Sequence, residues 1–173
     1  MNEINLKNLK LKTFTEQDAL DYCQINNINI EDITVINLDN NELTDISGIR
    51  LFKNLEVLWL GVNKLTDIKI IKKLKNLEVL HLNKNNELKD ISVLKDLINI
   101  KKLNIFYTAV KNISFIQYLK DLKLLNIIGL ELESNQIQYI KSLNNLEILY
   151  CKNGFKDMSV TDQLNKNIIN IVK

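Results

Sequence analysis

His81 is the only histidine among 173 residues and is the first candidate for acid–base or metal chemistry. A catalytic triad would need a Ser or Cys nucleophile at the same depth on a neighbouring stretch of chain. When the Leu-rich repeats of the chain are aligned, the residues that flank His81 are Trp59 and Asn104, and neither is such a nucleophile. A metal site would need a second His, a Cys pair at ligand spacing or an adjacent column of carboxylates, which the aligned repeats do not offer. We therefore expect His81 to be a contact residue, with no catalytic residue, metal site or cofactor.

The two cysteines, Cys23 and Cys151, are the next reactive side chains. Cys151 occupies the sixth position of the last aligned unit, and Cys23 lies in the expected amino-terminal cap. About five strand spacings, roughly 24 Å, separate them, whereas a disulfide needs Cα atoms within roughly 7 Å. Both are expected to be buried thiols, which is consistent with a reducing compartment.

The element that must position these residues is a repeat of Leu-x-x-Leu-x-Leu. Its six units begin at Ile33, Leu55, Leu77, Ile100, Leu122 and Leu146. The first part of each unit alternates like a strand, and the second part has apolar residues spaced by three, which suits a short 3₁₀ or loosely helical return. Self-similarity at a period of about 22 residues predicts a solenoid of stacked coils.

A polar residue recurs inside this apolar pattern, three positions after the sixth position of each unit. It is Asn in the first three units (Asn41, Asn63 and Asn85), then Thr108 and Leu130. We expect each Asn to lie inside and to satisfy backbone groups of the turning chain, with Thr108 as a partial substitute. Because Leu130 cannot do this and the fifth unit is two residues longer, the carboxyl-terminal third is expected to be irregular.

Residues 40–60 and 63–82 share the signature Asn-x-Leu-Thr-Asp-Ile. These segments resemble the bacterial leucine-rich repeats of the 22-residue, internalin-like type, and the resemblance covers about residues 33–149. It implies an α/β solenoid with a curved parallel sheet on the concave side and short helical or 3₁₀ returns on the convex side, capped at both ends. It does not imply one function, because such repeats serve adhesins, phosphatase regulators and intracellular scaffolds alike.

The expected domains are an amino-terminal tail and helical cap (1–32), the solenoid (33–153) and a carboxyl-terminal cap (154–173). Residues 15–18 resemble a capping box at the start of a short helix. Residues 159–162 are predicted to start a second helix, with a strand at 168–172 as the alternative. Residues 1–12 either add an edge strand or stay loose.

Charge and hydropathy limit the classes of partner. The chain has 23 Lys and Arg against 21 Asp and Glu, which is too balanced for a nucleic-acid binder. No apolar run approaches the roughly 18 residues of a membrane span, and Met1–Lys12 lacks the hydrophobic stretch of a secretory signal. We expect a cytoplasmic monomer with no membrane insertion, although a secreted fragment that lacks its native amino terminus would have the same sequence.

The concave face is the expected functional surface. Its side chains occupy the third, fifth, seventh and eighth positions of each unit, outside the Leu and Ile core. The predicted partner-binding residues there are Trp59, His81, Phe106, Tyr107, Val57, Val79, Asn104, Ile128 and Tyr150. Trp and Tyr often dominate binding energy at protein interfaces, although exposed strand positions also favour aromatic residues for their own sake.

The sequence thus predicts a non-enzymatic module that binds a protein or peptide on the concave face. One alternative is a fragment of an exported adhesin or effector that binds a host protein. Another is a regulatory or recognition subunit of an enzyme whose catalytic part lies elsewhere.

Overall fold

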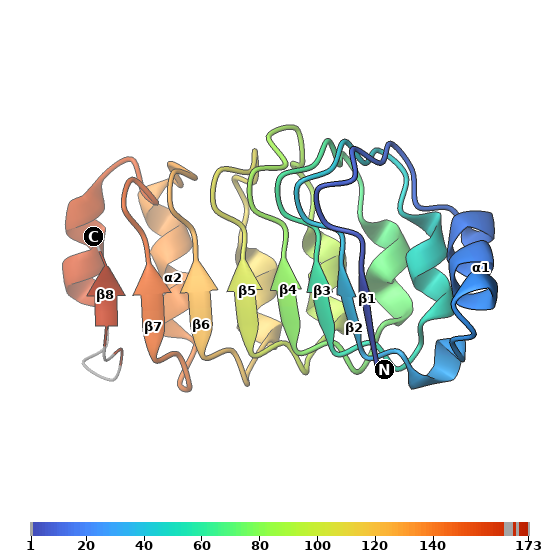
Figure 1. Cartoon of the computed structure of the whole chain (residues 1–173). Coiled ribbons are helices and arrows are strands. Elements are labelled where there is room, and N and C mark those ends of the chain that lie inside the picture. Colours follow the sequence, from blue (N-terminus) through green and yellow to red (C-terminus); the bar gives the residue numbers. More distant parts are fainter. Residues whose placement is uncertain (1, 165–167, 169, 173) are drawn as a thin grey trace.

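The fold is a single sheet of eight parallel strands, paired in chain order (Figure 1). The structure is a computed structural model, which describes residues 2–164, 168 and 170–172. The strands are β1 (Glu3–Asn5), β2 (Val35–Asn37), β3 (Val57–Trp59), β4 (Val79–His81), β5 (Lys102–Asn104), β6 (Leu124–Asn126), β7 (Ile148–Tyr150) and β8 (Asn170–Val172). Strands β2–β6 begin at the third position of the first five units, as the repeat predicts.

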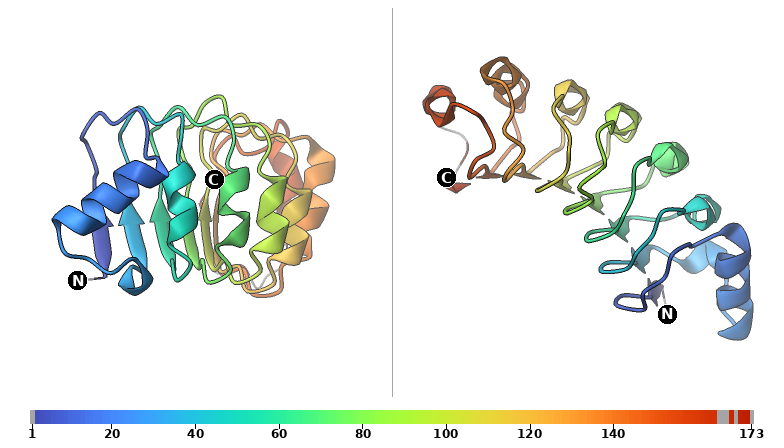
Figure 2. Two further views of the ribbon diagram at one scale, coloured as in Figure 1. Left: turned by 90° about the vertical axis from the view of Figure 1, so that its right-hand side faces the viewer. Right: turned by 90° about the horizontal axis from the view of Figure 1, so that it is seen from above.

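The returns between strands are short helices. Most are 3₁₀: η1 (Ile30–Asp32), η2 (Ser47–Leu51), η3 (Lys69–Lys73), η4 (Ser92–Asp96), η5 (Ser114–Tyr118), η6 (Ser134–Gln136) and η7 (Met158–Gln163). Apolar residues spaced by three favour this helix, in which such side chains align on one face. Seen from above, the strands lie on the inside of a curved stack and the returns on the outside (Figure 2).

The core lies between the sheet and the returns. The middle residue of each of strands β2–β7 points inward, and Leu58, Leu80 and Leu103 are fully buried. The flanking residues of each strand point to the concave face. This alternation confirms the predicted division between core and surface.

A buried ladder of asparagines links successive coils, as predicted. The Asn63 Nδ2 atom donates to the carbonyl oxygens of Leu38 and Leu60 at 3.0 and 3.1 Å. Its Oδ1 atom accepts from the Leu43 N–H at 3.0 Å. Asn41 and Asn85 bond in the same way, so each amide satisfies backbone groups of two coils.

The expected irregularity of the carboxyl-terminal third is wrong for the strands. Strands β6 and β7 keep the register of the others, although Thr108 donates only to a carbonyl of its own coil and Leu130 is apolar. The extra residues of the fifth unit are absorbed in its return, which contains α2 (Ile137–Lys141). Other side chains link the fourth and fifth coils: the Lys111 ammonium donates to the Leu130 carbonyl, and Gln136 Oε1 accepts from the Ile113 N–H at 3.0 Å.

A second asparagine ladder, which the sequence analysis missed, lies at the exposed turns before β3, β4, β5 and β7. Each member donates through Nδ2 to a backbone carbonyl of the preceding coil, as Asn99 does to Lys75 at 2.8 Å. The other members are Asn54, Asn76 and Asn145. The fourth unit has Asp121 at this position, and a carboxylate cannot donate this bond.

The amino-terminal helix begins at the predicted capping box. Helix α1 (Glu16–Ile25) starts with a capping box in which Thr15 Oγ1 accepts from the Asp18 N–H and Asp18 Oδ2 accepts from the Thr15 N–H. Ala19 and Cys23 are the buried residues of this helix. Of the two possibilities for residues 1–12, the strand is correct, and it forms β1.

The carboxyl-terminal end corrects one expectation. Helix η7 covers the predicted helix start at residues 159–162, but 170–172 form the strand β8 instead of continuing a helix. Pairing with β7 provides the backbone hydrogen bonds that favour the strand. Residues 165–167, 169 and 173 of the predicted cap lie outside the described part of the chain.

Candidate functional site

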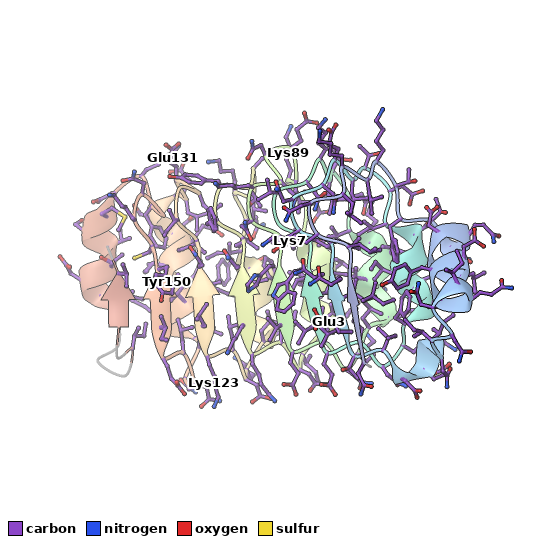
Figure 3. The ribbon with its side chains drawn as sticks, in the orientation of Figure 1. Glu3, Lys7, Lys89, Lys123, Glu131 and Tyr150 are labelled. Carbon is purple, nitrogen blue, oxygen red and sulfur yellow. The ribbon has the colours of Figure 1, made fainter. Side chains whose placement is uncertain are left out.

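The concave face presents all nine predicted site residues. Eight are half-buried, and Tyr107 is 51% exposed. In Figure 3 this face is toward the viewer, with Tyr150 on β7, Lys89 and Glu131 at the edge where strands end, and Lys123 at the edge where they begin. The interior is filled by other side chains, so core packing does not require aromatic residues here.

Two aromatic pairs form the centre of the face. The rings of Trp59 and His81 are neighbours on β3 and β4, with centroids 6.3 Å apart and planes tilted by 58°. Phe106 and Tyr107 meet edge to face at 5.5 Å. The Lys84 ammonium lies 5.8 Å from the centroid of Phe106, within the range of a cation–π contact.

The other predicted residues surround these pairs at different distances. Val57 and Val79 are direct neighbours in the sheet and provide apolar surface beside Trp59 and His81. Ile128 belongs to the unit after Phe106. Tyr150 is separated from Asn104 by Asn126 of β6, so it does not join the central cluster.

Asn104 has a local structural role that the sequence analysis missed. Its Oδ1 atom accepts from the N–H two residues later in the same strand end, at 3.4 Å. Asn37 and Asn126, at the same position in other units, make the same contact at 3.0 and 3.1 Å. An Asn at the fifth position therefore satisfies the N–H of the seventh position.

Aromatic residues at the fifth position remove this contact. In the second unit the N–H of Gly61 donates instead to Asp39 of the preceding unit, with 2.7 Å between Gly61 N and Asp39 Oδ1. The equivalent N–H in the third unit is that of Asn83. The residue of the preceding unit that could accept from it is Gly61, which has no side chain. Within the described part of the chain, no hydrogen bond satisfies the Asn83 N–H, the Trp59 Nε1–H or the His81 ring. Asp39 and Asn83 were not among the predicted site residues. Both occupy the seventh position of their units, which faces the concave side, so the aligned repeats could have indicated them.

The electrostatics of the face centre on His81. Burial lowers the pKa of His81, and Asp39 opposes this shift while Lys102 adds to it. Burial also raises the pKa of Asp39, against the Gly61 N–H bond, which lowers it. His81 is therefore neutral at pH 7, and it offers one N–H donor and one acceptor nitrogen.

Tyr107 is placed by its backbone and by a glycine of the next unit. Its φ is +49°, and the equivalent residues Val62 and Lys84 also lie in the left-handed region. A Cβ on Gly129 would lie 2.3 Å from Tyr107 Cε1, so the Tyr107 ring packs directly on Gly129. Val62, Lys84 and Tyr107 line one shallow groove at the edge of the sheet. Val62 is a β-branched residue at φ +56°, a conformation that such side chains rarely adopt.

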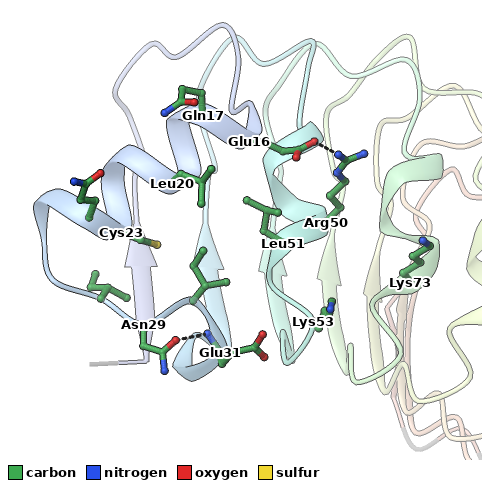
Figure 4. Close-up of a pocket in the computed structure, with 13 residues that line it drawn as sticks. Glu16, Gln17, Leu20, Cys23, Asn29, Glu31, Arg50, Leu51, Lys53 and Lys73 are labelled. Carbon is green, nitrogen blue, oxygen red and sulfur yellow. Dashed lines mark hydrogen bonds and ion pairs between the residues drawn. The ribbon is translucent and has the colours of Figure 1, made fainter.

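A separate hollow lies away from these residues. It is between α1 and η2, with apolar Leu20 and Leu51 inside and the Glu16–Arg50 ion pair across it (Figure 4). Cys23 also lines it, and burial raises the pKa of this thiol and disfavours a nucleophilic thiolate. We interpret this hollow as the joint between the cap and the first return.

The described residues contain neither a candidate metal site nor a candidate membrane span. No group of His, Cys, Asp and Glu side chains there has the arrangement of a metal site. None of the helices in that part of the chain has the length and apolar character needed to cross a membrane.

Comparison with known proteins agrees with the repeat. The family model described as "Leucine Rich repeats (2 copies)" matches residues 33–69 and 53–96. No curated protein matches the chain by sequence.

Among solved structures, an internalin (inlF) from Listeria monocytogenes is similar with a TM-score of 0.72 and 25% identity, over 81% of this chain and 41% of that one. An internalin C2 (inlC2) from the same organism has a TM-score of 0.74 and 23% identity, over 99% and 80%. A TDR receptor has a TM-score of 0.56 and 22% identity, over 69% and 23%. This chain thus spans about two fifths of the inlF structure.

Proposed function

Because the chain is a leucine-rich repeat protein of the bacterial, internalin-like type, we propose that it is a non-enzymatic module that binds a protein or peptide on its concave face. Internalin-like repeat folds are protein-interaction modules in general. The proposed contact residues are the two aromatic pairs, with Val57 and Val79 as apolar surroundings. Asn104, Ile128 and Tyr150 are proposed as outer contacts.

One observation carries this proposal: Trp59, Phe106 and Tyr107, which lie outside the core, are gathered with His81 at adjacent positions of one face. Trp59 and His81 are register neighbours, and Phe106 and Tyr107 belong to the next unit. Half-buried Trp and Tyr at the centre of a surface are the side chains that most often dominate binding energy. They contribute this energy because a partner removes large apolar areas from water.

Both alternative functions would use the same concave face, but with a different kind of partner. A fragment of an exported adhesin or effector would use this face for a host protein, and the similarity to part of a longer internalin favours it. A regulatory subunit would use it for an enzyme. A signal peptide in the complete gene would favour the first, and a fused or neighbouring catalytic domain the second.

The test compares matched tyrosines on the two sides of the solenoid. Tyr107 on the concave face and Tyr118 on η5 are 51% and 52% exposed, so each loses a similar ring when changed to Ala. A partner captured by the wild-type chain should bind the Trp59→Ala and Tyr107→Ala variants at least fivefold more weakly, whereas Tyr118→Ala should bind normally. Thermal stability should change little in these variants. Normal binding by Trp59→Ala together with loss in Tyr118→Ala would refute the concave site.

A further inference from the structure

Hydrogen bonds at the seventh position distinguish one unit from its neighbours. In the first, fourth and fifth units an Asn at the fifth position accepts from this N–H, and in the second unit Asp39 does so. In the third unit neither acceptor exists, because His81 replaces the Asn and Gly61 replaces the Asp. The N–H of Asn83 is therefore open within the described structure, and the chain itself shows that a carboxylate fits the equivalent N–H one coil away.

Other donors lie around this open N–H. The neutral His81 ring has one N–H, and the Trp59 indole has another. The Asn83 side chain lies across Gly61, where a Cβ would approach its amide oxygen to 2.6 Å. The small size of Gly61 thus makes room for the side chain of Asn83 on the concave face.

The charges near these donors are mainly positive. In the first four units the charged residues at the concave positions are Asp39, Lys84 and Lys102. The Asp39 carboxylate is already bonded to Gly61, whereas neither lysine forms an ion pair within the described residues. Acidic residues are found at the edge where strands begin, where Glu78 pairs with Lys101 at 2.6 Å and Glu56 precedes β3.

This inference rests on the proposed function and specifies the partner. We propose that the concave face selects a protein segment in which an acidic side chain lies next to an apolar one. The carboxylate accepts from the Asn83 N–H and from His81, as the Asp39 carboxylate does from Gly61. Lys84 and Lys102 provide complementary charge, and the apolar side chain packs between the Trp59 and Phe106 rings.

The groove at the edge of the sheet supports this placement. Val62, Lys84 and Tyr107 occupy left-handed backbone positions that Asn40 and Asn153 fill in other units. Asn tolerates this conformation far better than a β-branched or aromatic residue does. In three consecutive units the strained positions thus carry two apolar side chains and one cation around one groove, next to the open N–H.

The experiment uses a phage-displayed library of random dodecapeptides, panned on the whole chain. Recovered peptides are synthesised and titrated while the fluorescence of Trp59, the only Trp in the chain, is followed. We expect enrichment of Asp or Glu beside an apolar residue, and a loss of about tenfold in affinity when the acid is changed to its amide.

Three variants test the acceptor site. His81→Asn places at this position the residue of the first, fourth and fifth units, so its own side chain closes the Asn83 N–H; the variant should remain folded and bind at least fivefold more weakly. Lys102→Glu should weaken acidic peptides more than their amide versions. Lys95→Glu, an exposed convex lysine on η4, should have no effect on either peptide.

The outcomes separate this inference from the proposed function. The control is panning of the same library on Trp59→Ala. If the recovered peptides require Trp59 but show no preference for acidic residues, the acidic-segment inference is wrong and the concave site stands. Preference for basic peptides would also overturn the acidic-segment inference. Binding that is indifferent to Trp59, or a library that yields no binder, would count against both.

Discussion

Replacement of Asn85 by Ala should destabilise the protein by about 3 kcal/mol, through loss of buried hydrogen bonds. The Asn85 side chain is fully buried, and it makes three hydrogen bonds: to the carbonyl oxygens of Leu60 and Leu82, and from the Leu65 N–H. A typical bond contributes roughly 0.5–1.5 kcal/mol net, and a buried group left without a partner costs about 1–3 kcal/mol. The three together give the expected total, because water cannot reach this position.

Asn99→Ala is the matched control for this experiment. Asn99 belongs to the exposed ladder and makes one bond, to Lys75 at 2.8 Å, so its loss should cost less than about 1 kcal/mol. Urea titrations followed by circular dichroism would give both free energies of unfolding. If Asn85→Ala and Asn99→Ala are equally stable within about 0.5 kcal/mol, the buried ladder does not hold the coils together as inferred.

Strain, protonation and thiol burial give three further expectations. Val62→Asn should raise the free energy of unfolding by about 1 kcal/mol in urea, because Asn relieves the left-handed strain; a loss would contradict the strain. Acid should destabilise the chain through His81: its folded pKa is lowered, so the unfolded chain binds the proton first as pH falls below about 6.5. The melting temperature should therefore fall relative to that of His81→Asn on acidification, and parallel curves would exclude this cause. Both buried cysteines should react with a thiol reagent only on unfolding, and rapid labelling of the native chain would show that an end frays.

The sequence was sufficient for the strands and their register, because the core positions repeat. Positions such as Leu58 and Leu80 alternate with residues of other types and recur with one spacing, so each strand places them on the same side of the sheet. The buried role of Asn63 followed from the same regularity. The helical interpretation was wrong at residues 170–172, because so short a segment fits both periods and pairing with β7 decides between them.

The candidate site could be predicted only in part. Trp59 and His81 could be assigned to the concave face because both occupy the fifth position of a unit, and the alternation along a strand determines the side to which that position points. The open N–H of Asn83 could not, because it depends on which side chain of the adjacent coil reaches each backbone group. Likewise, the packing of Tyr107 on Gly129 joins two units that no period connects.

The junction between the third and fourth units lacks both asparagine links, because Thr108 bonds within its own coil and Asp121 cannot donate. In a stack where each coil touches only its neighbours, folding is a row of coupled steps, and weaker coupling at one step divides the row into two cooperative blocks. We expect amide hydrogen exchange to show the two blocks opening separately at this junction. His81 belongs to one block and Phe106 to the other, so a partner bound across them would tie the blocks together and make the whole array unfold as one.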